Sequence, residues 1–240
     1  MSILFADIES TGLDKEKHAL VEIAAIPYDI EKGEPIVLKM RPFDGALIDP
    51  DALRITGMNR DEIMSWADPR DQLYKFIEWI DSHDKKFRIG GHNIKFDIGF
   101  IHKWFMRYGC YTEYHTRFRS DTVCTFEMAK KLDLKKKGKS ESNKLGDLCK
   151  AFNIKLDNAH SALPDIEATV ELYEILKSMM PKIVNHKFEG SYQDARRKFL
   201  DLSYVIFNPE GDIFINEKAT KDPEALRFIL SEIWDLYCSD

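Results

Sequence analysis

The chain has 240 residues, of which 44% are hydrophobic and 32% charged, a balance typical of one globular domain or one domain with an appendage. Its formal net charge of −6 argues against a passive nucleic-acid binder, which is usually basic, although a carboxylate-rich metal site would reverse the local field. No apolar run approaches the roughly 18 residues that span a bilayer, so we expect no membrane association.

The amino terminus and the cysteines bear on the cellular compartment. Asp7 and Glu9 interrupt the apolar run near the amino terminus and no basic segment precedes it, so we expect no secretory signal. The cysteines are scattered, with no CxxC pair and no zinc-like spacing (Cys110, Cys124, Cys149 and Cys238). In a chain of this size these features predict reduced thiols and a cytoplasmic protein.

Three strands are predicted at the start of the chain. Apolar runs cover residues 3–8, 20–28 and 36–40. The turn segment 31–34 separates the last two runs and contains Gly33, which is available for a positive φ. The pattern predicts a meander of three strands.

Helices follow the meander. Asn59 and Glu62 have the spacing of a capping box, and Asp68-Pro69 is typical of an N-cap followed by proline at the first helical position. A short strand over 87–89 ends at Gly90-Gly91, and further helices are expected over about 93–108, 123–132, 144–152 and 164–179. Strands first and alternation later predict an α/β fold with a mixed β-sheet flanked by α-helices.

A basic, glycine-containing stretch covers residues 135–139 and is followed by Ser140, Glu141 and Ser142. A solvated surface loop is the simpler interpretation of such a charge run, and contact with phosphate groups is the alternative. The sequence leaves both open.

Residues 182–240 form a second segment beyond Pro181, which ends the last helix of the first domain. The runs 204–207 and 212–215 flank Asn-Pro-Glu-Gly and predict a hairpin. A closing helix is expected from apolar residues at helical spacing (Leu226, Phe228, Ile229, Ile233 and Trp234). We therefore expect a domain over 1–181 and a small C-terminal α+β extension over 182–240, whose role is unassigned.

Three carboxylates occupy positions where the surrounding pattern is apolar. Asp7 lies on the first predicted strand and Glu9 follows two residues later, so both side chains share one face. Such carboxylates repel each other, and a divalent cation such as Mg²⁺ or Mn²⁺ removes that penalty. Asp97 lies in a helix that is apolar nearly all round, where an unpaired charge is costly. A polar turn after the strand and a helix dipole acting on Asp97 are the structural alternatives.

His160 and Asp165 complete the set. Pro164 suits the first turn of a helix, which places Asp165 on that helix and His160 on the preceding loop. A lone histidine there is more often a polar loop residue. With four carboxylates, however, two cations about 3.5–4 Å apart can clamp the attacking and leaving oxygens of a phosphoryl displacement. His160 can then take a proton from the attacking water.

At these residues the sequence resembles the DEDDh branch of the DnaQ-like exonucleases, which includes polymerase proofreading subunits, oligoribonucleases and RNase T. The similar motifs lie at residues 5–13, 91–97 and 159–165. Further similar segments cover 21–26, 55–58 and 121–122, and the resemblance extends over about 2–180.

The resemblance implies a ribonuclease-H-like fold and a metal-dependent 3′→5′ exonuclease. Such an enzyme hydrolyses phosphodiester bonds from the single-stranded or frayed 3′ end of nucleic acid and releases nucleoside 5′-monophosphates. DNA is the favoured substrate and RNA the alternative. A homodimer and a polymerase or repair partner both stay open.

The resemblance also implies roles for single residues. Asp7, Glu9 and Asp165 would hold the tightly bound Mg²⁺ or Mn²⁺, with Asp7 bridging. Asp97 would serve a second ion, mainly through water, and His160 would be the general base. A further group would contact the terminal nucleotides, with the leucine and the methionine packing on bases (Thr11, Gly12, Leu13, Met58 and Asn93).

Two other functions stay open. The pattern Asp7-x-Glu9-x-Thr11 also resembles the opening loop of haloacid-dehalogenase-like phosphatases, but glutamate replaces the usual aspartate, and this reading leaves Asp97 and His160 unused. A catalytically silent nucleic-acid-binding module is the other alternative, although no carboxylate of the set is missing. Neither the oligomeric state nor the biological pathway follows from the sequence.

Overall fold

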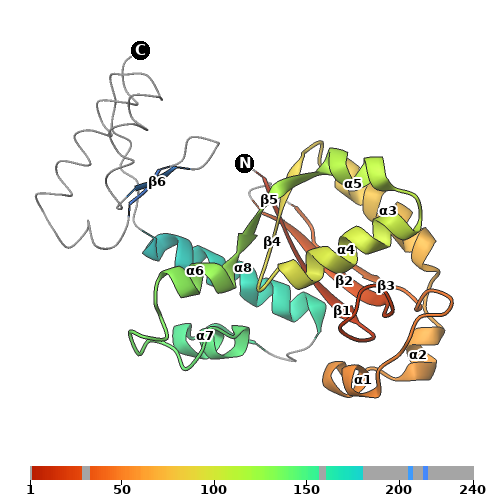
Figure 1. Ribbon diagram of the computed structural model, residues 1–240, viewed down its shortest axis with the longest axis horizontal. Helices are drawn as coiled ribbons and strands as arrows, with labels where there is room; N and C mark the ends of the chain where they lie inside the picture. The colour runs from red at the N-terminus through yellow and green to blue at the C-terminus, as the bar shows by residue number, and fades with distance from the viewer. Residues whose placement is uncertain (1, 29–32, 157–160, 181–204, 208–212, 216–240) are drawn as a thin grey trace, which may run out of the picture. The chain divides into compact units, whose positions relative to one another are not determined.

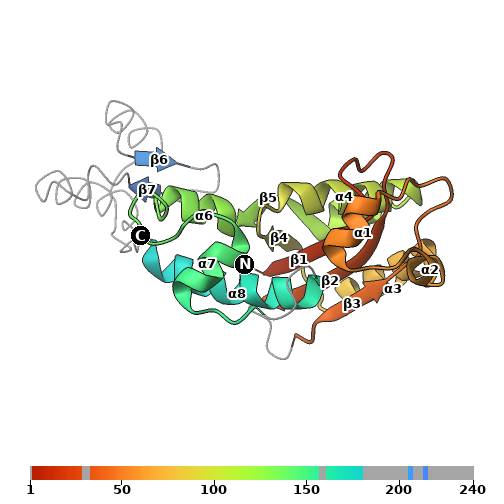
Figure 2. The same ribbon diagram turned by 90° about the horizontal axis from the view of Figure 1, so that it is seen from below.

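The fold is taken from a computed structural model, which describes residues 2–28, 33–156, 161–180, 205–207 and 213–215. The chain divides into two units, Met1–Met179 and Met180–Asp240. The first unit contains a five-stranded sheet and the second a two-stranded sheet (Figures 1 and 2).

The five-stranded sheet has the order β3-β2-β1-β4-β5 and is mixed, as the sequence predicts. Strand β1 (Ile3–Ser10) pairs antiparallel with β2 (Leu20–Tyr28), which pairs antiparallel with β3 (Ile36–Lys39). On its other side β1 pairs parallel with β4 (Phe87–Gly91), which pairs parallel with β5 (Phe118–Cys124). Because β1 is central and covered on both faces, its sequence is a nearly continuous apolar run.

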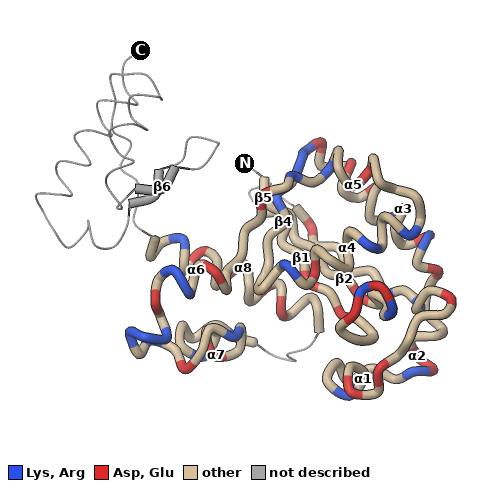
Figure 3. Tube along the Cα trace, viewed as in Figure 1, with Lys and Arg blue, Asp and Glu red and all other residues tan. Residues whose placement is uncertain are grey.

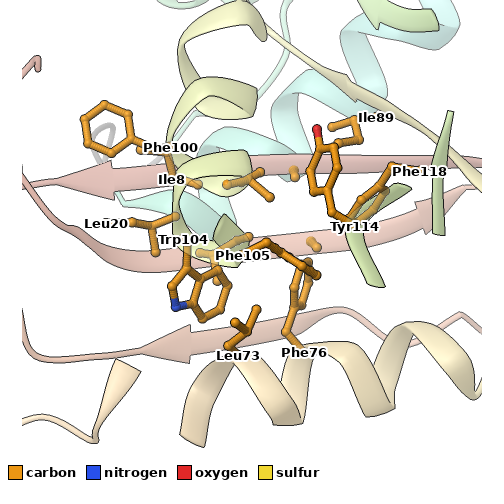
Figure 4. Packing of buried hydrophobic residues seen from close by; sticks show 14 of the residues in the cluster. Ile8, Leu20, Leu73, Phe76, Ile89, Phe100, Trp104, Phe105, Tyr114 and Phe118 are labelled. Atoms are coloured by element: carbon orange, nitrogen blue, oxygen red, sulfur yellow. The ribbon is translucent and has the colours of Figure 1, made fainter. Parts of the chain in front are cut away.

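One face of the sheet packs under helices α3 (Pro69–Asp81), α4 (Lys95–Arg107) and α5 (Tyr111–Arg117). In Figure 4, Phe76 of α3 and Trp104 and Phe105 of α4 lie between these helices and the strands. Truncating a buried ring such as Phe105 to alanine costs roughly 3–5 kcal/mol. This face therefore holds the larger part of the core.

The opposite face is covered by α8 (Ala162–Met179), as the second view of the ribbon shows (Figure 2). Ala162 and Ile166 pack against Ile3 and Phe5 of β1. Side chains alternate along a strand, so Asp7 and Glu9 continue the same face as Ile3 and Phe5. The carboxylates of β1 thus point to the side on which α8 lies.

Helices α6 (Thr125–Lys131) and α7 (Leu145–Phe152) pack on α8 through a separate apolar cluster. Its buried members come from all three helices, the connection between α6 and α7, and the residue after the C-cap of α7 (Ala129, Leu134, Leu148, Cys149, Ile154, Ala168, Leu172 and Leu176). These helices extend the layer that α8 begins.

The predicted helix N-caps are confirmed. The Asn59 side chain accepts hydrogen bonds from the backbone amides of Asp61 and Glu62, where α2 (Arg60–Met64) begins. Asp68 caps α3 in the same way by accepting from the Arg70 amide. The strands of the C-terminal hairpin are also confirmed, since β6 (Val205–Phe207) pairs antiparallel with β7 (Ile213–Ile215). The expected closing helix lies outside the described residues.

Three elements differ from the sequence-based prediction. The helix expected over 123–132 begins only at Thr125, because residues 118–124 form the strand β5. Two short helices were not predicted, α1 (Pro50–Thr56), which buries no side chain, and α5, which buries only Tyr114. Gly33 does not take a positive φ; a Cβ there would lie 2.5 Å from Cγ of Pro27, so close packing accounts for the glycine. Within the described residues no helix is long and apolar enough to cross a membrane.

Candidate active site

Asp7, Glu9 and Asp165 come together at the end of the central strand. One carboxylate oxygen from each lies within 4.8 Å of the other two. Asp165 is in the first turn of α8, and the packing of Ala162 and Ile166 against β1 holds that turn beside the strand. Residues separated by more than 150 positions therefore form one carboxylate cluster of a kind that can bind a metal ion.

Asp97 reaches the same place from the other side of the sheet. It lies in the first turn of α4, is buried, and accepts a hydrogen bond at Oδ1 from the backbone amide of Ile8 at 3.3 Å. Ile8 is the residue between Asp7 and Glu9. The approach is close because Gly91 ends β4; a Cβ at Gly91 would lie 2.9 Å from the Ala6 carbonyl oxygen.

The electrostatics of this cluster are unfavourable for charged carboxylates. Burial and the charges of Asp97, Glu9, Asp165 and Glu22 raise the pKa of Asp7 well above its usual value. Burial, followed by Asp165, Glu22 and Asp97, raises the pKa of Glu9 to about 8. Burial also raises the pKa of Asp97 to about 7, although the hydrogen bond from Ile8 opposes this shift. The pKa shifts of Asp7 and Glu9 thus reflect burial and then neighbouring negative charge, whereas that of Asp97 reflects burial.

Glu22 is a fifth acidic residue beside the cluster, and the sequence-based reasoning gave it no role. It lies on β2 directly opposite Glu9 and is 3% exposed. Its carboxylate pairs with Lys39 Nζ of β3 at 3.3 Å. The signal was present, because Glu22 interrupts an apolar run just as Asp7 does.

The loop after β1 is held by the buried Thr11. Its hydroxyl donates to the Leu47 carbonyl at 2.7 Å and accepts from the Ala19 amide at 2.9 Å. Gly12 follows, where a Cβ would lie 2.3 Å from the His18 ring. Leu13 is 83% exposed. Thr11 and Gly12 thus fix a loop that leaves Leu13 open to solvent.

The other predicted substrate contacts lie on separate segments. Met58 is half-buried between α1 and α2, and Asn93 is exposed and takes a φ of 58° just before α4. The roles of Thr11, Gly12, Leu13, Met58 and Asn93 in binding nucleotides stay predictions. His160 lies outside the described residues, so its role also stays a prediction.

The comparisons with known proteins agree with this geometry. Residues 4–173 match a family model described as exonuclease. The chain is 28% identical over 188 residues to the PolC-type DNA polymerase III of Bacillus cereus, covering 76% of this chain and 12% of the polymerase. It is 29% identical over 184 residues to ribonuclease T of Shewanella frigidimarina, covering 70% of this chain and 78% of that protein.

Among solved structures, E. coli exonuclease I in complex with a dT13 oligonucleotide matches with a TM-score of 0.66 and 24% identity, over 87% of this chain and 47% of that chain. This likeness shows the fold, a ribonuclease-H-like mixed sheet flanked by helices. The chain spans only 12% of the PolC-type polymerase and less than half of exonuclease I. The family match covers most of the chain and excludes the phosphatase interpretation. This chain belongs to the exonuclease family, whose members depend on divalent metal ions.

Proposed function

We propose that this protein is a 3′→5′ exonuclease that hydrolyses phosphodiester bonds at the 3′ end of single-stranded nucleic acid and releases nucleoside 5′-monophosphates. One observation carries the proposal. Carboxylate oxygens of Asp7, Glu9 and Asp165 lie within 4.8 Å of one another, and Asp97 is hydrogen bonded to the strand between the first two.

The donor set fits two Mg²⁺ or Mn²⁺ ions. All donors are carboxylate oxygens, which these cations prefer. The pKa values of Asp7 and Glu9 are raised by burial and by neighbouring carboxylates, and that of Asp97 by burial, and a bound cation would favour the charged form of all three. When bound, two such ions stabilise the attacking and leaving oxygens of an in-line displacement and lower the pKa of water.

Each carboxylate has a distinct part in holding these ions. Asp7, Glu9 and Asp165 would hold the tightly bound ion, with Asp7 bridging to the second. One oxygen of Asp97 is already used by the Ile8 amide, which favours contact with the second ion through water. His160 would accept the proton of the attacking water, since its ordinary pKa lies near neutral pH.

The terminal nucleotide would lie against the loop after β1. An exposed leucine beside a polar cluster is a suitable surface for the face of a base, and Leu13 is 83% exposed. Thr11 and Gly12 would keep this loop in place, whereas Met58 would pack on a base and Asn93 would contact the nucleotide from the α4 side.

Single-stranded DNA is the substrate that we propose as preferred. Exonuclease I has been solved with a dT13 oligonucleotide, and the PolC-type relatives are DNA polymerases. RNA is the alternative, as the similarity to ribonuclease T indicates. A polymerase or repair protein, or a second copy of this chain, would be the protein partner.

The test is a digest of 5′-end-labelled single-stranded and double-stranded DNA and RNA with Mg²⁺ and, separately, with Mn²⁺. We expect labelled products that shorten from the 3′ end, with nucleoside 5′-monophosphates as the released product and single-stranded DNA digested fastest. A circular single strand should survive, because it has no 3′ end. Cutting of the circle would indicate an endonuclease, and binding of metal and strand without turnover would indicate a silent binding module.

A further inference from the structure

The positive charge of the chain is concentrated in one segment. Residues 130–150 contain eight lysines and three acidic residues, a formal charge of +5 in a chain whose total is −6. Four of these lysines lie in residues 135–139, the lysine turn, between α6 and α7. In Figure 3 the blue stretches of α6 and of the connection to α7 mark this segment. The carboxylate cluster and the cationic segment are thus separate parts of one domain.

The lysine turn has a defined backbone. Leu134, just before it, is 1% exposed and belongs to the cluster beneath α8. The amide of Lys137 donates to the Asp133 carbonyl at 2.9 Å, and that of Lys139 donates to the Leu134 carbonyl at 3.0 Å. Gly138 closes the turn with a φ of 66°, which favours glycine. A surface loop with this bonding presents its charges from fixed positions.

The charges of the turn are open to solvent. All residues of the turn are exposed. Lys136 pairs with Asp133 at 3.4 Å, and in the part of the chain that the structure describes neither Lys135 nor Lys139 forms an ion pair. Within the described part of the chain, Lys135 and Lys139 are therefore available to a ligand.

Two contacts connect this segment and the start of α6 to elements that carry active-site residues. The His92 side chain hydrogen bonds with the backbone of Asn143, and its Nδ1 lies 2.9 Å from Thr125 Oγ1. His92 directly precedes Asn93, at the end of β4 that faces the carboxylates. At the far end of the segment, Cys149 of α7 belongs to the same apolar cluster as Ala168 of α8, one turn from Asp165.

We propose that the lysine turn binds the phosphate backbone of the substrate strand, independently of sequence, beyond the nucleotides in the active site. The proposal rests on the exonuclease function proposed above. An acidic chain repels a polyanion, and the buried carboxylates add to that repulsion at the active site. Lysines on the same domain offset it by contacting several phosphates and releasing their counterions. Charge complementarity favours this occupant over an acidic protein.

The test compares two triple variants with equal changes of charge. One replaces Lys135, Lys136 and Lys139 by alanine. The control replaces Lys75, Lys85 and Lys86, which are equally exposed but lie on α3 and just before β4, at the opposite end of that strand from the active site. Initial rates are measured on a single-stranded 20-mer and on a dinucleotide over a range of salt concentrations, and thermal melts check that each variant is folded.

For the lysine-turn variant we expect kcat/KM on the 20-mer to fall roughly tenfold near physiological salt, with kcat and the dinucleotide rate unchanged. The slope of log kcat/KM against log salt should become shallower by about 2, because three phosphate contacts at about 0.7 each are lost. The control should match the wild type, and replacing the same three lysines by arginine should preserve binding.

Three outcomes would overturn the proposal. Equal losses on the 20-mer and the dinucleotide, or equal losses in both triple variants, would show a general charge effect. Wild-type rates of the lysine-turn variant on the 20-mer would leave an acidic protein as the partner for this surface. A wild-type protein that digests neither substrate would instead contradict the exonuclease function itself.

Discussion

The five-stranded sheet carries acidic residues toward both ends of its parallel strands, and their charge partners differ between the two ends. Asp121 of β5 lies at the end where β4 begins, and its oxygens are 2.6 Å from Arg88 Nε and 2.8 Å from Arg119 Nε. Burial raises the pKa of Asp121, but the hydrogen bond from Arg119 and the charges of both arginines outweigh burial and lower it. Nearby, Arg117 donates hydrogen bonds from Nε and Nη2 to the two carboxylate oxygens of Asp81. This end of the sheet neutralises its own carboxylates.

At the other end, Glu22 is paired with Lys39 in a similar way. Asp7, Glu9 and Asp97, in contrast, form no ion pair with any described residue, and the pKa values of all three are raised. Because arginines pair with the acidic residues at one end of the sheet, the same fold could also have placed arginines beside the acidic residues at the other end. Keeping these buried acids without a basic partner costs stability. A bound metal cation, in place of an arginine or lysine side chain, therefore explains why the acids are there.

Removing one ligand of the cluster should have the largest effect. Asp7→Asn takes away the bridging carboxylate, and a loss of about 5.5 kcal/mol of transition-state stabilisation lowers the exonuclease rate by about 10⁴-fold. Because the substitution also removes repulsion, the metal-free variant should melt at a higher temperature than the wild type. Digestion assays and thermal melts measure both effects, with the exposed Asp61→Asn as the matched control. Wild-type turnover by the Asp7 variant would remove the metal site from the mechanism.

The general base should have the next largest effect. His160→Ala should lower kcat by roughly 10²–10⁴-fold, the usual contribution of a general base. Titration calorimetry with Mn²⁺ should give the same affinity as the wild type, because only the carboxylates are proposed to hold metal. Lost metal affinity would show that His160 is itself a metal ligand, so that the site would combine an imidazole nitrogen with the carboxylates.

The fold could be predicted from the sequence where the structure of a segment depends on the residues of that segment alone. The apolar runs of β1 and β2 and the caps Asn59 and Asp68 depend on neighbouring residues only, and all were predicted. β5 was missed because polar Arg119 and Asp121 interrupt it, and Asp121 also pairs with Arg88 of another strand, which the local sequence does not indicate. Helix α1 was missed because none of its residues is buried, so it has no apolar face to recognise.

The site was predictable for the opposite reason, since its residues violate the local pattern. Asp7 and Asp97 stand out because apolar neighbours surround a charge. Glu22 violates the pattern in the same way, but its pairing with Lys39 depends on strand register that the sequence does not give. The hydroxyl of Thr11 bonds the Leu47 carbonyl, 36 residues away, while its contact with the substrate stays a prediction. Such long-range partners are visible only in the folded chain.

The pH dependence of stability should distinguish the two ends. Glu9 and Asp97 have folded pKa values of about 8 and 7, above their unfolded values, so their stabilising protonation is complete in acid and is lost as pH rises through 7 to 8. The metal-free protein should therefore lose about 6 kcal/mol between pH 5 and 8, at about 1.4 kcal/mol per pH unit and group, a fall of about 12–24 °C in melting temperature. Saturating Mg²⁺ or Mn²⁺ should abolish this decline, because bound metal replaces the protons. A flat profile in the presence of chelator would contradict the raised pKa values.

The smallest effect, and the sharpest test of the comparison, is expected at the neutralised end. Asp121→Asn leaves Arg88 and Arg119 without their carboxylate, and the side chains are 27–34% exposed, so water compensates in part. The free energy of unfolding should fall by about 1–2 kcal/mol, less than for a fully buried pair, and the melting temperature by about 2–6 °C.

The direction in which the melting temperature changes is the informative measurement. The same aspartate-to-asparagine substitution should stabilise the metal-free protein at position 7 and destabilise it at position 121, while the exonuclease rate is lost only in the first. Melts of both variants at pH 7.5 with chelator, beside rates with Mg²⁺, measure the contrast. A shift of melting temperature in the same direction for both would mean that local packing, rather than the supply of charge partners, sets the difference between the two ends of the sheet.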